Sequence, residues 1–110
     1  MPFVEIKNEI LGKKYELSIV FCGNALSQKL NRIYRGKNKP TNVLSFSLEK
    51  ASGEIIIDLK KAKTESALFG EKFQNFIGYL FIHGLLHLKG LSHGRTMEAK
   101  EQKIRKMFDI

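Results

Sequence analysis

The sequence predicts an α+β fold, in which helices pack on a small mixed sheet of about four strands. Segments with strand character are concentrated in the first half of the chain, and helical segments dominate the second half. The longest apolar stretch, residues 76–88, is too short to span a bilayer and fits a buried central helix. At 110 residues, the chain is expected to form one domain that spans residues 1–110, with no membrane partner.

Four segments have the residue pattern of strands. Residues 3–6 form a short candidate strand at the start of the chain. Residues 15–21 follow a period-two pattern of apolar side chains, which is typical of a half-buried strand. Residues 43–48 place three large apolar side chains on one face. Residues 54–58 contain three consecutive isoleucines and are therefore expected to be covered on both sides.

Four other segments have helical patterns. The first begins after Asn24, a favourable N-cap, and ends near Gly36. Residues 59–69 are a weaker helical segment, and residues 72–88 form a long helix that is apolar almost all round. In the terminal segment, residues 96–108, acidic side chains lie early and basic ones late, which matches the helix dipole.

The chain is strongly basic. It has 19 Lys and Arg against 11 Asp and Glu, which gives a net charge of +8 at pH 7. This excess favours a polyanionic partner such as nucleic acid. The alternative is that the charge only keeps a small protein in solution.

The chain also carries indications of its compartment. Cys22 is the only cysteine, so the chain cannot form an intramolecular disulfide. The first residues lack the charged and apolar regions of a secretory signal. Both observations favour the cytosol.

All three histidines of the chain lie within eleven residues, at His83, His87 and His93. On a helix, side chains at i and i+4 share one face, with Cβ atoms about 5–6 Å apart. This spacing suits two imidazoles that bind one Zn²⁺ at roughly 2.0–2.1 Å. Gly90 can end the helix in the left-handed conformation, so that the chain turns back and brings His93 as the third ligand. Three ligands leave a fourth position open, as in catalytic zinc sites.

Other interpretations of the histidines remain open. They could be hydrogen-bonded residues of a buried helix, and a three-histidine site also accepts Ni²⁺ or Cu²⁺. The spacing is the same as in the metzincin pattern H-E-x-x-H-x-x-G-x-x-H. However, Gly84 stands where that pattern has its general base, which argues against a metalloprotease.

Four blocks of sequence resemble the YbeY family of bacterial ribosomal-RNA maturation factors. The histidine block is the most specific, and the blocks follow the order found in the family. They are residues 30–37 (LNRIYRGK), 41–46 (TNVLSF), 53–57 (GEIII) and 83–93 (HGLLHLKGLSH).

The resemblance implies a cytoplasmic, zinc-dependent endoribonuclease that cuts single-stranded RNA. It also implies action in 3′-end maturation of small-subunit ribosomal RNA and in ribosome quality control, with the small subunit or its proteins as partners. One Zn²⁺ would bind the three histidines. Arg35 matches a functional arginine of the family near the metal. Glu54, on a matching strand, is a candidate general base.

The basic side chains could then supply affinity for phosphate. Those near the Arg35 block and the weaker helix would contact RNA, and those of the terminal helix would contact RNA or a ribosomal protein. The two sets are Lys37, Lys39, Lys60, Lys61 and Lys63, and Lys100, Lys103, Arg105 and Lys106.

The chain departs from the family at three carboxylates. Ser92 replaces the usual Asp before the third histidine, Asn42 replaces the Asp after Thr41, and Glu54 replaces an Asp. The chain is also short for the family, and the pattern has no helix between the first two predicted strands. These departures leave the general base unassigned. Two alternatives are a non-catalytic RNA-binding or ribosome-assembly factor with a structural metal, and a different metallohydrolase, which Gly84 and the positive charge disfavour.

Overall fold

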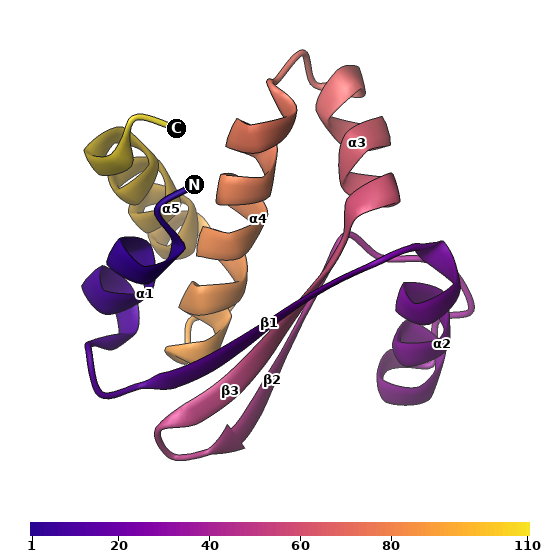
Figure 1. The fold of residues 1–110 in the computed structure, drawn as a ribbon, viewed down its shortest axis with the longest axis horizontal. Helices are drawn as coiled ribbons and strands as arrows, with labels where there is room; N and C mark the ends of the chain where they lie inside the picture. The colour runs from indigo at the N-terminus through magenta and orange to yellow at the C-terminus, as the bar shows by residue number, and fades with distance from the viewer.

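The computed structural model describes residues 1–110 as one three-stranded sheet with five helices (Figure 1). The predicted α+β class is therefore confirmed. The elements, in chain order, are α1 (Phe3–Leu11), β1 (Glu16–Cys22), α2 (Asn24–Arg35), β2 (Val43–Glu49), β3 (Ser52–Asp58), α3 (Leu59–Leu68), α4 (Phe73–Leu88) and α5 (Arg95–Phe108).

The sheet is mixed, as expected, but it has three strands rather than about four. Its order is β1-β3-β2, with β1 parallel and β2 antiparallel to β3. β3 is the central strand, and its residues Ile55, Ile56 and Ile57 are at most 6% exposed. The prediction that this strand is covered on both sides is confirmed.

The prediction of a strand at residues 3–6 is wrong, because α1 begins at Phe3. Phe3, Ile6 and Ile10 recur at i, i+3 and i+7, which is a helical rather than a strand period. Ile6 and Ile10 are buried in the core, and Phe3 packs against it. A helix therefore precedes β1, in the part of the chain where the sequence pattern predicts none.

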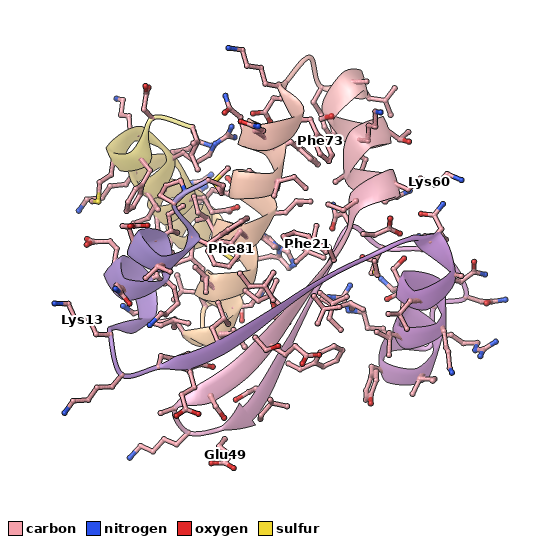
Figure 2. The ribbon with its side chains drawn as sticks, in the orientation of Figure 1. Lys13, Phe21, Glu49, Lys60, Phe73 and Phe81 are labelled. Atoms are coloured by element: carbon pink, nitrogen blue, oxygen red, sulfur yellow. The ribbon has the colours of Figure 1, made fainter.

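α4 is the central helix of the core. Figure 1 shows it beside α1 and α5, with the sheet between this group and α2. Phe81, labelled in Figure 2, is fully buried and meets the ring of Phe3 edge to face at 4.8 Å. None of the five helices has the length and apolarity needed to cross a bilayer.

Gly84 allows α4 to lie very close to the sheet. A Cβ atom at Gly84 would lie 2.9 Å from Ser45 Oγ of β2 and 3.1 Å from Ile55 Cδ1 of β3. Ser45 Oγ also donates a hydrogen bond to the Gly84 carbonyl at 3.1 Å. This close approach brings the histidine-bearing turns of α4 next to β2.

Asp58 joins α2 and α3 at the end of β3. Its buried carboxylate accepts hydrogen bonds from Ser27 Oγ of α2 at 2.6 Å and from the Lys61 amide of α3 at 2.9 Å. The side-chain amide of Asn24, with its nitrogen turned to the carboxylate, donates to it at 2.7 Å. The carboxylate caps α3 and fixes the first turn of α2, so the direction of α2 and the place of Arg35 at its end are set.

Candidate metal centre

The structure brings His83, His87 and His93 together. The two α4 histidines lie one turn apart, and each of the three residues offers a ring nitrogen within 4.8 Å of the others. The ring centroids are 4.6 to 5.0 Å apart. The three imidazoles thus form a cluster, as the spacing of the histidines predicts.

A glycine-containing turn delivers His93. α4 ends at Leu88, and Gly90 follows with φ +106°, in the region that favours glycine. The Leu91 amide then donates to the Leu86 carbonyl at 3.0 Å, so the chain folds back over the end of the helix. Gly90 therefore has the predicted role at the helix end.

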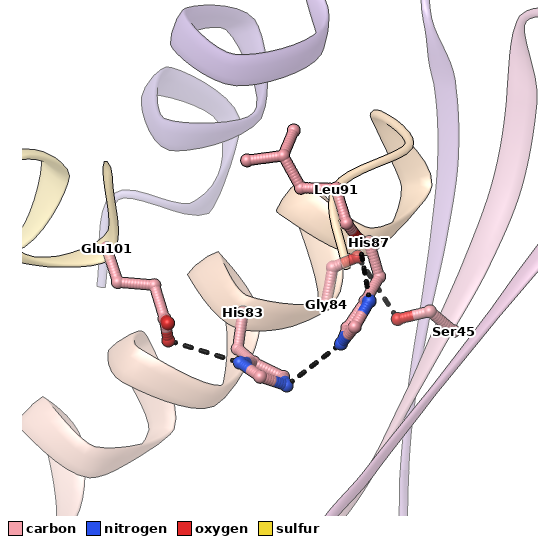
Figure 3. Close-up of polar contacts among 6 residues, drawn as sticks. All are labelled: Ser45, His83, Gly84, His87, Leu91 and Glu101. Atoms are coloured by element: carbon pink, nitrogen blue, oxygen red, sulfur yellow. Dashed lines mark hydrogen bonds and ion pairs between the residues drawn. The ribbon is translucent and has the colours of Figure 1, made fainter. Parts of the chain in front are cut away.

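Two hydrogen bonds fix how the α4 histidines are protonated (Figure 3). Nδ1 of His83 lies 3.1 Å from Glu101 Oε2, and Nδ1 of His87 lies 3.1 Å from the Leu91 carbonyl. Both partners are acceptors, so each Nδ1 donates and carries the proton. With both rings neutral, the two Nε2 lone pairs face each other at 3.1 Å, so this contact needs either a shared proton or a metal ion between the rings. A cation between them satisfies both lone pairs.

The spacing of the nitrogens suits zinc. In a tetrahedral zinc site, each ligand nitrogen lies about 2.0–2.1 Å from the metal, and two such nitrogens lie roughly 3.4 Å from each other. The two Nε2 atoms of His83 and His87 have a similar separation. The pKa of His87 is lowered by burial and then by the neighbouring His83 and His93 rings, with a smaller effect of Arg35. His87 is therefore neutral near pH 7 and can act as a ligand.

Glu101 is a site residue that the sequence patterns did not single out. It lies on α5, is 4% exposed, and accepts from His83. Such a carboxylate behind a histidine fixes the ring orientation and makes the imidazole a better metal ligand. A signal was present, because Met97, Glu101 and Ile104 fall at i, i+4 and i+7 on the inner face of α5. A carboxylate within such a stripe indicates a specific buried partner.

The histidines line a cavity of about 660 Å³. Arg35, at the end of α2, lines the same cavity, as the resemblance implies. No acidic side chain lines it. The lining residues besides Arg35 and the histidines are Lys37, Asn42, Val43, Ser45 and Tyr79.

Glu54 does not lie with the histidines. Side chains alternate along a strand, and the neighbouring Ile55 points toward Gly84 of α4. Glu54 therefore points to the opposite face of the sheet and does not line the cavity. Asn42 does line the cavity, and its amide donates to Glu65 of α3 at 2.9 Å.

Tyr79 is a second cavity residue that the sequence patterns missed. Its ring centroid lies 6.1 Å from that of His83, and the Arg105 guanidinium lies 5.3 Å from its centre. Burial and the nearby Glu101 raise the pKa of Tyr79, so its hydroxyl stays protonated and can donate. Arg105 also pairs with Glu71, so this cation of the terminal helix already has a partner within the chain.

Sequence comparisons with known proteins agree with the motif blocks. The family model described as Endoribonuclease YbeY matches residues 3–109. A protein named endoribonuclease YbeY from Geobacillus kaustophilus is 37% identical over 115 residues, covering 86% of this chain and 74% of that protein. The protein of the same name from Lysinibacillus sphaericus is 35% identical, with 87% of this chain and 69% of that protein covered.

A solved structure has the same arrangement of elements. The solution structure of a Thermotoga maritima protein matches 91% of this chain and 71% of its own, with a TM-score of 0.67 and 27% identity. The match of the family model over nearly the whole chain and the identity to these relatives lead to one conclusion: the chain belongs to the endoribonuclease YbeY family.

Proposed function

We propose that this chain is a zinc-dependent endoribonuclease that cuts single-stranded RNA. One observation carries the proposal: three histidines offer ring nitrogens within 4.8 Å of one another in a cavity that Arg35 also lines. The family supports a role in 3′-end maturation of small-subunit ribosomal RNA and in ribosome quality control, in the cytoplasm. Residues 1–110 would act as a single domain, with ribosomal RNA and the small subunit as partners.

The metal ligands in this proposal are His83, His87 and His93, with one Zn²⁺ per chain. The arrangement is zincin-like, because a helix supplies two histidines one turn apart and the following turn supplies the third. Bound zinc supplies Lewis-acid stabilisation of phosphate charge and activates water as a nucleophile near pH 7.

Arg35 and its neighbours would hold the phosphate. The Arg35 guanidinium forms no ion pair within the chain, so it can donate two parallel hydrogen bonds to the non-bridging phosphate oxygens. The Lys37 ammonium adds a second positive charge on the same wall. The Tyr79 hydroxyl stays protonated in the same cavity and would donate a proton to the departing ribose oxygen.

The test combines zinc content with RNA cleavage. Wild type should contain about one zinc per chain and cleave a single-stranded RNA. The variant with His83, His87 and His93 all changed to Ala should contain none and should not cleave. Ser92→Ala, a change to a neighbouring exposed side chain, serves as the control and should keep both properties. Equal zinc content in wild type and the triple variant would rule out the site.

The lack of a carboxylate in the cavity favours one other function, a non-catalytic RNA-binding factor with a structural metal. This factor would bind ribosomal particles and keep its zinc but would leave RNA intact. Wild type that holds zinc, binds the small subunit and cleaves no RNA would establish this alternative.

A further inference from the structure

A second cavity adjoins the histidine pocket. Its volume is about 290 Å³, and no hydrophobic residue lines it. Arg35, Lys37 and Asn42 line both cavities, so the two are adjacent. Lys39 and Lys61 line only the second cavity, which lies between the 37–42 segment and α3.

The second cavity carries an excess of positive charge. Four cations line it, Arg35, Lys37, Lys39 and Lys61, and none of them forms an ion pair within the protein. Its one carboxylate, Glu65, accepts a hydrogen bond from Asn42 at 2.9 Å. Uncompensated cations in a concave surface concentrate positive potential and favour an anionic ligand.

The backbone of this cavity is fixed before any ligand binds. Asn31 is 1% exposed, and its side-chain Nδ2 donates to the Lys39 carbonyl at 2.9 Å. The backbone carbonyl of Asn31 accepts a hydrogen bond from the Lys37 amide at 3.3 Å. At the other end of the segment, the Asp58 amide donates to the Asn42 carbonyl at 2.9 Å. Binding there would order little additional chain, so it would cost little conformational entropy.

We propose that the second cavity binds a further phosphate of the RNA strand whose cleaved phosphate lies at the histidines. The inference rests on the proposed function. Lys39 and Lys61 would contact this phosphate, and Arg35 would lie between the two phosphates. A phosphate backbone fits better than an acidic protein segment, because protein interfaces have an apolar centre and this cavity has no hydrophobic lining residue.

The test uses two uncleaved RNA analogues, a dinucleotide that carries a single phosphate and a strand of roughly 16 nucleotides. The variant Lys39→Gln/Lys61→Gln removes both charges and leaves the histidine pocket unchanged. Its affinity for the long RNA should fall, and the slope of log affinity against log salt should become shallower by about 0.7, the value for one phosphate contact on a single strand. Its affinity for the short RNA, its cleavage of short RNA, its zinc content and its thermal midpoint should match wild type.

Lys13→Gln/Lys14→Gln is the matched control, because it removes two exposed charges elsewhere. Figure 2 shows Lys13 at the opposite side of the molecule from Lys60, the neighbour of Lys61. An equal loss of long-RNA affinity in this control would assign the effect to net charge and overturn the inference. Equal losses for the short and long RNA would also overturn it.

Failure of the inference can be separated from failure of the proposed function. Normal cleavage by wild type, with an unchanged salt slope in the Lys39→Gln/Lys61→Gln variant, would contradict only the second phosphate site. Intact RNA binding with lost binding to ribosomal particles would assign the cavity to a protein partner and overturn the inference. Wild type that neither binds nor cleaves RNA would overturn both.

Discussion

Glu101 orients His83 through a hydrogen bond to Nδ1, so its charge should be felt at the metal. Glu101→Gln keeps the size of the side chain and removes the carboxylate charge. We expect zinc affinity, measured by competition with a chelator, to fall about 10-fold. Glu98→Gln is the control, because Glu98 is exposed on the same helix and contacts no ligand. Unchanged affinity in Glu101→Gln would show that the carboxylate does not support the ligand.

Arg35 is exposed, has no internal partner, and lines the histidine cavity. Its role should therefore appear in catalysis rather than in folding. We expect Arg35→Ala to lower RNA cleavage by about 100-fold, a loss typical for a group that stabilises transition-state charge, with zinc content and thermal midpoint unchanged. Arg35→Lys should recover little, because an ammonium cannot form the planar two-fold contact. Wild-type cleavage by Arg35→Ala would make Arg35 an ordinary surface residue.

His87 couples the stability of the metal-free protein to pH. Its pKa in the folded chain is lowered, so the unfolded chain takes up this proton first as the pH falls below about 6.5. The neutral His87 ring therefore contributes to the free energy of unfolding above that pH. This contribution is lost as the pH falls through the pKa of His87 in the folded chain. We expect the thermal midpoint of metal-free wild type to fall more on acidification than that of His87→Gln. Parallel decreases in the two proteins would contradict this.

At the scale of whole elements, the contact of α4 with the sheet depends on Gly84. Gly84→Ala would force a methyl group against Ser45 and the buried Ile55, at a cost of about 1–3 kcal/mol. The gain in helix propensity offsets about 1 kcal/mol of this. We expect a lower free energy of unfolding, measured by urea denaturation. Ile55→Val removes the nearest carbon of Ile55, so the double variant should lose less than the sum of the two single changes. Additive losses would show that no such clash exists.

The same contact explains a feature of the motif. The metzincin pattern has a glutamate at the position of Gly84, where any side chain would force Ser45 Oγ or Ile55 Cδ1 to move. A glycine at this position therefore suits the close packing of α4 on the sheet.

Most elements could be predicted because their patterns are local. The helices after Asn24 and over residues 72–88, and the buried strand at Ile55–Ile57, were predicted close to their observed bounds. The first segment was wrong because four residues are too few to separate a strand from the start of a helix, and the period shows only once Ile10 is included.

The site could be predicted only in part, for a related reason. His83 and His87 lie on one helix, so their spacing alone indicates convergence. Glu101 comes from another helix, and its approach to His83 depends on how α5 packs on α4. The resemblance indicates Glu54 from its place in a family strand, but the direction of its side chain depends on the contact of Ile55 with α4.

At the scale of the whole molecule, the net charge of +8 should dominate RNA affinity. Binding to an RNA backbone releases counterions, so log affinity should fall linearly with log salt, by about 0.7 for each phosphate contact on a single strand. We expect a steep negative slope for a single-stranded RNA, measured by fluorescence anisotropy. A flat slope would remove nucleic acid as the main partner.

The turn after α4 would set how tightly a metal ion is held at the three histidines. His83 and His87 form a pre-assembled pair on a rigid helix, and five residues tether His93 to that pair. The effective concentration of the third ligand is therefore set by the length and stiffness of residues 88–92. A longer or looser tether would weaken metal retention while every ligand stays the same, whereas a change confined to an exposed side chain, such as Ser92→Ala, would not. Zinc affinity and the chemistry of the site are thus separable properties of this fold.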